Sequence, residues 1–114
     1  MPSDEALGSL QQLAMLAVLR LGGDAYGASI QQELDTRAGR SVAISTIYVT
    51  MERLERKGLV RSWLADPTPV RGGKAKRYYA LTGTGVSALR EARAAMDAMW
   101  AGVDLHPALR SSRA

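Results

Sequence analysis

Apolar residues recur at helical spacing in three segments within the first 60 positions, which predicts three helices there. The first stripe runs from Leu7 to Leu21 and ends at Gly22-Gly23, and the other sides of the same helix are also largely apolar. A helix that is apolar on most sides is buried on more than one of them. In a chain of this size, we expect part of that burial to come from a second subunit.

Two further helices are predicted from residues that can cap them and from the apolar residues that follow. Asp24 is the expected cap of a helix from about 25 to 36, and Ser45 is the expected cap of a helix from about 46 to 57. The predicted inward face of the later helix is Ile47, Met51 and Leu54, and its predicted outward face is Thr46, Val49, Thr50, Arg53 and Lys57. Together the two helices form a helix-turn-helix.

The stretch after Gly58 predicts a hairpin of two short strands. LVRSWLA (59–65) and KAKRYYAL (74–81) are rich in strand-forming residues, and prolines and glycines occupy the loop between them. Successive strand residues point to opposite faces, so we expect one of Tyr78 and Tyr79 in the core. Helices followed by a hairpin and one more helix predict a winged helix-turn-helix, an α+β fold that is mainly α.

The last predicted helix is capped by Thr82 and extends to about position 101. Its apolar positions alternate in steps of three and four, with one arginine among them, a pattern typical of helices that pair. We therefore expect a winged helix-turn-helix domain (1–81), a dimerisation helix (82–105) and a disordered tail (106–114). The residues expected in a dimer interface are Leu7, Leu10, Ala14, Val86, Leu89, Arg93, Met96, Trp100 and Val103.

The charge distribution favours nucleic acid as a partner. The chain has 15 Lys+Arg against 11 Asp+Glu, and eight of the basic residues lie between positions 53 and 77, where only Glu55 and Asp66 oppose them. A basic centre on a slightly acidic body is typical of proteins that bind nucleic acid. The outward helix face can enter a major groove, and the basic hairpin can lie along the backbone. A solvated charged surface is the alternative explanation.

Several classes of site are excluded by residue types that are absent or isolated. The chain has no cysteine, which excludes disulfides, thiolate metal sites and thiol nucleophiles. Its single histidine, His106, stands in the predicted tail, so we expect no metal site and no cofactor. Asp4 and Glu5 stand where a signal peptide carries basic residues, and the apolar run 13–21 is shorter than the roughly 20 residues that span a bilayer. These features predict a cytoplasmic protein.

One motif points to a different function, that of a nucleotide-binding enzyme. Gly83, Gly85 and Ala88 match the G-x-G-x-x-G/A pattern that holds a pyrophosphate at a helix N-terminus. That pattern requires a β-α-β unit with a parallel sheet, whereas here the preceding strand pairs in a hairpin and no strand is predicted after the helix. No cluster of general bases or nucleophiles accompanies the glycines. We therefore expect no catalytic residues and no enzyme activity.

Three blocks of the sequence resemble the PadR family of bacterial transcriptional regulators: AYGASIQQEL (25–34), STIYVTMERLERKGLV (45–60) and GGKAKRYYALTGTG (72–85). Members have a Tyr-Gly near the second helix, a Tyr followed by Leu-Glu-x-x-Gly-Leu around the recognition helix, and a basic wing that ends in Tyr-Tyr-x-Leu-Thr-x-x-Gly. The matching residues are Tyr26-Gly27, Tyr48, Leu54-Glu55, Gly58-Leu59, Tyr78-Tyr79, Leu81-Thr82 and Gly85. The resemblance extends from about residue 10 to residue 95.

The resemblance implies a homodimeric repressor that binds double-stranded DNA at a pseudo-palindromic operator. It also implies that short members dimerise through a single C-terminal helix, and that some bind a flat aromatic effector stacked on a tryptophan between the subunits. Here that helix carries Trp100, with Met96 as a second candidate for the ligand site; the alternative for Trp100 is a packing residue. An adaptor that binds proteins and not DNA is the alternative function.

The candidate DNA-binding surface combines hydroxyl, aromatic and basic side chains. Arg53 is the expected base reader, and Lys57 is an expected phosphate contact. Tyr48 is expected to be half-buried, so that it serves both the core and a phosphate. The full candidate set is Tyr26, Ser45, Thr46, Tyr48, Val49, Thr50, Arg53, Lys57, Arg71, Lys74, Lys76 and Arg77.

Overall fold

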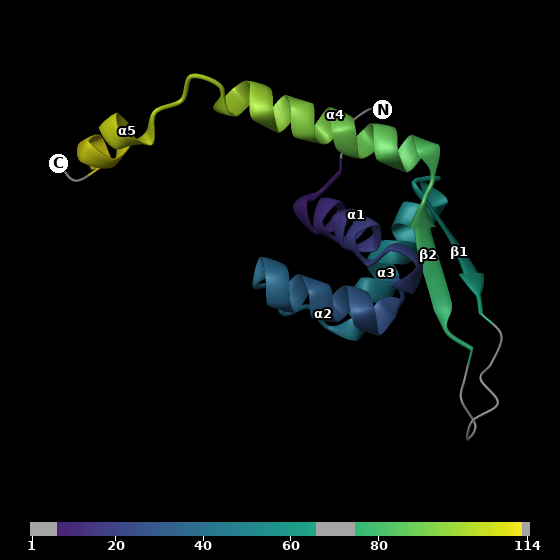
Figure 1. Ribbon diagram of the computed structural model, residues 1–114. Coiled ribbons are helices and arrows are strands. Elements are labelled where there is room, and N and C mark those ends of the chain that lie inside the picture. Colours follow the sequence, from purple (N-terminus) through teal and green to yellow (C-terminus); the bar gives the residue numbers. More distant parts are fainter. Residues whose placement is uncertain (1–6, 66–74, 113–114) are drawn as a thin grey trace.

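The computed structural model describes residues 7–65 and 75–112, which form a helical body, a two-stranded antiparallel sheet and an extended C-terminal arm (Figure 1). The elements are α1 (Ser9–Leu21), a 3₁₀ turn η2 (Gly22–Asp24), α2 (Gly27–Ala38), α3 (Ile44–Arg56), β1 (Val60–Leu64), β2 (Arg77–Leu81), α4 (Gly83–Trp100) and α5 (Leu105–Ser112). This order confirms the predicted winged helix-turn-helix with a long helix after it.

The core lies where α1, α2 and α3 meet and where the sheet packs against them. Met15 of α1, Ile30 of α2 and Met51 of α3 are fully buried together, and Tyr79 of β2 joins them. Ala14, which we expected in a dimer interface, is also fully buried in this core. That expectation was wrong because Ala14 stands one residue before Met15 and four before Val18, on the side of α1 that the subunit itself covers.

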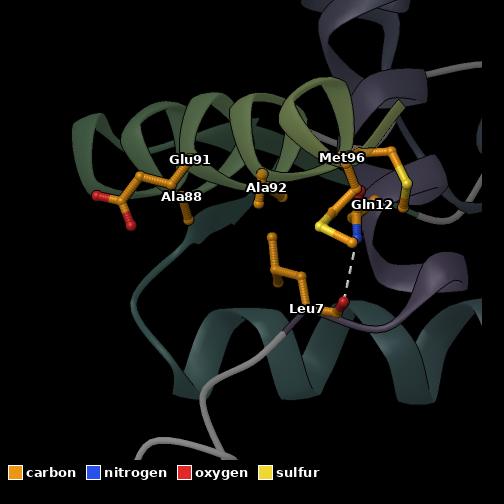
Figure 2. A pocket seen from close by; sticks show the side chains of 8 residues that line it. Leu7, Gln12, Ala88, Glu91, Ala92 and Met96 are labelled. Carbon is orange, nitrogen blue, oxygen red and sulfur yellow. Dashed lines mark hydrogen bonds between the residues drawn. The ribbon is translucent and has the colours of Figure 1, made fainter. Parts of the chain in front are cut away.

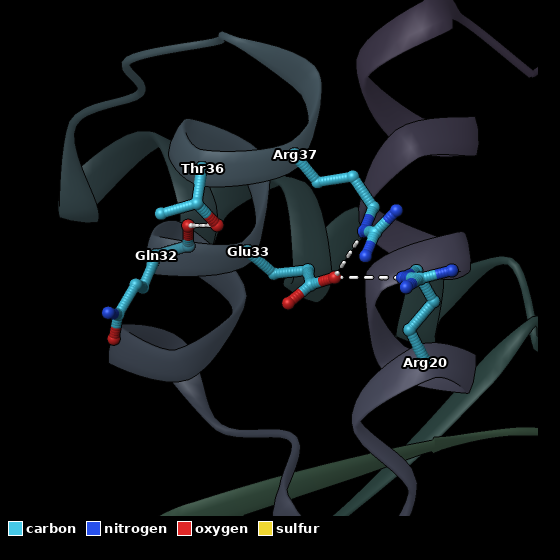
Figure 3. A network of polar contacts seen from close by, with 5 residues as sticks. All are labelled: Arg20, Gln32, Glu33, Thr36 and Arg37. Carbon is cyan, nitrogen blue, oxygen red and sulfur yellow. Dashed lines mark hydrogen bonds and ion pairs between the residues drawn. The ribbon is translucent and has the colours of Figure 1, made fainter.

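A small ion-pair network fastens α2 to α1 (Figure 3). The Glu33 carboxylate accepts a hydrogen bond from Arg20 Nε at 2.8 Å, and it lies 3.3 Å from Arg37 Nε. Thr36 Oγ1 donates to the Gln32 carbonyl on the other side of α2 at 2.9 Å. Arg20 thus joins α1 to α2, whereas Arg37 pairs with Glu33 within α2, and neither arginine belongs to the candidate DNA-binding set.

The sheet follows the predicted alternation of side chains. Val60 pairs with Leu81 and Leu64 pairs with Arg77, and Tyr79 is the tyrosine that faces the core. On the opposite face, the ring of Tyr78 lies 5.6 Å from that of Tyr26 and 6.3 Å from that of Trp63, measured between centroids. Trp63 thus belongs to an aromatic row that supports the wing.

Burial gives Tyr79 a measurable effect on stability at high pH. It raises the pKa of the Tyr79 hydroxyl, although nearby Arg77 acts in the opposite direction. The folded protein therefore holds this proton more tightly than the unfolded chain, so the free energy of unfolding should fall as the pH rises past about 10. Denaturant titrations between about pH 8 and about pH 11 should show that the free energy of unfolding falls less steeply with pH in Tyr79→Phe than in the natural protein. Equal dependence on pH in the two proteins would contradict a raised pKa for Tyr79 in the folded state.

The starts of α2 and α3 differ from the predicted ones. Ser29, not Asp24, organises the start of α2: its Oγ accepts from the Tyr26 N–H at 2.9 Å and donates to the Asp24 carbonyl at 2.7 Å. Asp24 lies in η2. Ser45 is not a cap either, because α3 already begins at Ile44 and no side chain accepts from its first turn.

Thr82 caps α4 as predicted and also fastens it to the end of α3. Its Oγ1 accepts from the Gly85 N–H at 3.0 Å and donates to the Gly58 carbonyl at 2.7 Å. Gly85 lies directly on the backbone before β1, and a Cβ at this position would be 2.0 Å from the Leu59 carbonyl oxygen. Gly83 has open space around it. The family glycine is therefore required for close packing of α4.

The predicted disordered tail is wrong over most of its length, because residues Leu105–Ser112 form α5. Asp104 Oδ1 accepts from the His106 N–H at 3.0 Å and so caps this helix. Pro107 stands in the first turn, where a missing N–H removes no hydrogen bond of the helix. Figure 1 shows α4 leaving the body and carrying α5 away from it, and the longest extent of the molecule is 63 Å.

Candidate nucleic-acid interface

The exposed face of α3 is centred on Ser45, Val49, Glu52 and Arg56, which we call the reading stripe. These residues follow one another at intervals of four, three and four, so they lie in one line along the helix, opposite Ile47 and its buried neighbours. Glu52 Oε2 and Arg56 Nη2 are 3.3 Å apart, and both side chains are largely exposed. The stripe therefore presents a hydroxyl, an apolar group, an acceptor and a donor to solvent.

The predicted outward face of α3 is rotated away from the observed one. Thr50 is only 7% exposed, and its Oγ1 donates to the Thr46 carbonyl at 2.7 Å, so its expected contact with bases was wrong. Thr50 follows Ile47 by three residues and precedes Leu54 by four, which places it on the buried side of the helix. Thr46 and Arg53 are exposed and lie beside the stripe.

Lys57 also differs from its expected position. It is half-buried, and its Nζ donates to Gln11 Oε1 of α1 at 3.1 Å. It therefore helps to fasten the end of α3 to α1, with its ammonium group directed at the body of the subunit.

Glu52 and Arg56 were missed as candidate site residues. A sequence signal was present, because the middle of the exposed face lies directly opposite the apolar residues that define the buried face. The predicted face was centred on Thr46 and Thr50 because threonine suits contacts with bases. The angle of each residue around the helix axis places the exposed face part of a turn away, at the reading stripe.

Four of the candidate residues surround one hollow between α2, α3 and the wing. Tyr26, Tyr48, Lys76 and Arg77 line it together with Gly27, and its volume is about 440 Å³. Tyr48 is 50% exposed, and its ring covers Gly27 so closely that a Cβ there would be 2.7 Å from the Tyr48 hydroxyl oxygen. Arg71 and Lys74 lie outside the described residues.

The two cations at this hollow are held by Tyr26, directly before α2, and by Ser62 of the wing. Lys76 Nζ lies 4.2 Å from the centroid of the Tyr26 ring, a cation–π contact. Arg77 Nη1 donates to Ser62 Oγ of β1 at 2.9 Å. The hollow thus combines two positive charges with an exposed tyrosine hydroxyl, next to the reading stripe.

An apolar face along α1 and α4 contains most of the predicted dimer residues. Figure 2 shows one hollow in it, where Leu7 and Gln12 face Ala88, Ala92 and Met96. A second hollow of about 540 Å³ adjoins it; among the residues that line it are Leu16, Leu19, Val86, Leu89, Arg93 and Met96. Leu16 and Leu19 were not in the predicted set, although the apolar character of all sides of α1 was the signal for them.

The two candidate ligand-site residues lie at different places on this apolar face. Met96 lines both hollows and is 56% exposed. Trp100 stands one turn later on α4 and is 53% exposed.

Other predicted dimer residues differ in their burial. Leu7 and Leu10 are half-buried against the core, and Leu89 is nearly covered. Val103 follows the end of α4 and is exposed.

Among the described residues, no three His, Cys, Asp or Glu side chains are grouped as a metal site would require. Within the same part of the chain, no helix combines the length and the apolar character needed to cross a bilayer.

Comparison with known proteins gives consistent matches to one family. The transcriptional regulator PadR-like family matches residues 15–91. The transcriptional regulator Rv3488 of Mycobacterium tuberculosis is 39% identical over 74 residues, 65% of this chain and 64% of that protein. A PadR-like transcription factor from Bacteroides fragilis is similar in structure, with a TM-score of 0.70 and 31% identity over 85% of this chain and 88% of that one. Bacillus subtilis PadR, solved in complex with operator DNA, shares the fold with a TM-score of 0.59 and 24% identity, over 72% of this chain and 46% of that one.

Proposed function

Since the chain belongs to the PadR-like family of transcriptional regulators, we propose that it is a sequence-specific repressor that binds a pseudo-palindromic operator as a homodimer. The observation that carries this proposal is the exposed reading stripe of α3 beside a hollow that holds Lys76 and Arg77. A relative of the same fold was solved with operator DNA bound. Members of the family are regulators and not enzymes, so the nucleotide-binding alternative is excluded.

Base reading is assigned to the reading stripe. An α-helix fits the major groove, where a guanidinium such as that of Arg56 can donate two hydrogen bonds to guanine. The Glu52 carboxylate can accept from the amino group of cytosine, and Val49 can contact a thymine methyl group. Lys76 and Arg77 reach phosphates on the flanking backbone, which fixes the position of the helix in the groove.

Replacing Arg56 with alanine should relax the preference for one base pair in each half-site. For each half-site the affinity should fall by roughly 5- to 150-fold, because a good bidentate contact contributes about 1–3 kcal/mol of discrimination. Titration of labelled duplexes that differ only at that base pair measures the effect. Arg61→Ala removes the same charge on the wing face next to Trp63 and should leave the preference intact. An unchanged preference in Arg56→Ala would contradict this role.

Dimerisation is assigned to the apolar face of α1 and α4. It exposes Leu16, Leu19, Met96 and Trp100 beside one another on two packed helices, and a grouped exposed apolar surface is typical of a protein–protein interface. A two-fold axis through this face would place the two α3 helices on successive turns of one side of the duplex. The pseudo-palindromic operator follows from that symmetry.

Release from DNA is assigned to a small flat aromatic compound bound between the subunits. Trp100 is exposed on the proposed interface and offers a ring for stacking, and Met96 lies one turn away with a polarizable sulfur. A compound inserted there would change the spacing of the two α3 helices and weaken operator binding. Quenching of Trp100 fluorescence, measured in a Trp63→Phe background, should therefore accompany loss of operator affinity; quenching with unchanged affinity would contradict the release mechanism.

A further inference from the structure

A chain of side-chain hydrogen bonds joins α3 to both strands of the wing. Arg77 Nη1 of β2 donates to Ser62 Oγ of β1 at 2.9 Å, and Ser62 Oγ lies 2.9 Å from each carboxylate oxygen of Glu55 on α3. A hydroxyl has one hydrogen, so Ser62 donates to Glu55 while it accepts from Arg77. We call this chain of three residues the wing relay.

We propose that the wing relay holds Arg77 in the orientation in which it contacts a DNA phosphate, so that Glu55 and Ser62 are positioning residues for that contact. The inference rests on the proposed DNA-binding function. The Glu55 carboxylate fixes the direction of the Ser62 hydroxyl, and the Ser62 oxygen fixes one edge of the guanidinium. An arginine that is already held in place loses less rotamer freedom when it binds a phosphate.

The interposed serine leaves the guanidinium available for a second partner. A direct pair between Arg77 and Glu55 would use two parallel donors of the guanidinium fork and would neutralise its charge. In the wing relay, the guanidinium donates a single hydrogen bond to a neutral oxygen. Within residues 7–65 and 75–112, this is the one hydrogen bond that the Arg77 side chain makes. Most of its five N–H donors therefore remain free.

The position of Arg77 directs these free donors at the proposed DNA surface. Arg77 is exposed at the start of β2 and lines the hollow that also contains Tyr48 and Lys76. Glu55 belongs to the same helix as the reading stripe, so the wing relay links the phosphate contact directly to the base-reading element. A fixed distance between Arg77 and the reading stripe would align the wing with the DNA backbone when α3 occupies the major groove.

The test is the salt dependence of binding to one operator duplex by four variants: Ser62→Ala, Arg77→Ala, their double variant and Ser62→Thr. The slope of log K against log salt falls by about one for each phosphate contact that is lost. Ser62→Ala should reduce the slope by about one per subunit, as Arg77→Ala does. The double variant should show no further loss, and Ser62→Thr, which keeps the hydroxyl, should restore the original slope.

Arg61→Ala is the matched control, because Arg61 is an exposed cation next to Ser62 on β1 whose guanidinium carbon lies 4.8 Å from the Trp63 ring centroid. Its slope should equal that of the natural protein. The inference is overturned if Ser62→Ala binds with the original slope, if the losses of Ser62→Ala and Arg77→Ala add, or if Ser62→Ala lowers only the unfolding midpoint. A natural protein without salt-dependent DNA binding would instead overturn the proposed function.

Discussion

Replacing Gly85 with alanine should destabilise the protein by about 3 kcal/mol, whereas the same change at Gly83 should alter stability by less than about 1 kcal/mol. A Cβ at position 85 would lie 2.0 Å from the Leu59 carbonyl oxygen, and the obstacle is backbone that cannot rotate away. Relief requires movement of α4 away from β1, which would also stretch the hydrogen bond from Thr82 Oγ1 to the Gly58 carbonyl.

Gly83 provides the matched control, because it lies in the same helical turn and a Cβ added there would have no neighbour within 4 Å. Equilibrium unfolding in urea measures both variants, and the midpoint should drop clearly only for Gly85→Ala. If the two alanine variants were equally stable, the close approach of α4 to Leu59 would not be a requirement of the fold, and the family glycine would need another explanation.

Placing a charge at Met96 should convert the proposed homodimer to a monomer and reduce operator affinity by at least about 100-fold. Met96 is 56% exposed on the apolar face of α1 and α4, so aspartate there leaves the subunit core intact. It would, however, bury a carboxylate in an apolar interface, where removing the charge from water is costly. A dimer that binds two half-sites at once has an affinity roughly 10²–10⁴ higher than one subunit on one half-site, and the monomer loses this gain.

The matched control is Ala94→Asp, which adds the same charge to an exposed position of α4 away from both hollows. Sedimentation equilibrium should show a dimer for this variant and for the natural protein, and a monomer for Met96→Asp. Titrations of operator DNA with the same samples should show reduced affinity for Met96→Asp and not for Ala94→Asp. A Met96→Asp protein that stays dimeric would place the interface elsewhere on the molecule.

The order of elements from α1 to α4 could be predicted because each is specified by local signals, whereas α5 was missed. Helical spacing ended by Gly22-Gly23 and Gly58, strand formers on both sides of a loop, and the Thr82 cap all act within a few residues. Gly85 could be singled out by its place in the family pattern, although the close packing against Leu59 that requires it could be known only from the structure.

The details that failed at Thr50 and Lys57 depend on the rotation of a helix or on a contact between distant parts of the chain. Thr50 carries a residue type that suits DNA, but its angle on α3 places it in the core. Lys57 is held by Gln11, which is 46 residues away in the sequence. The wing relay likewise joins Arg77 to Ser62 across 15 residues. Such pairings depend on how helices and strands pack, and no local pattern specifies them.

The most direct test of the central claim is selection of bound sequences from a random pool of double-stranded DNA by the natural full-length protein. We expect enrichment of two inverted half-sites whose centres lie about one helical turn, roughly 10 bp, apart, with affinity that falls steeply as salt rises. Enrichment of a single unpaired half-site, or of no sequence at all, would contradict a homodimer that reads an operator through α3.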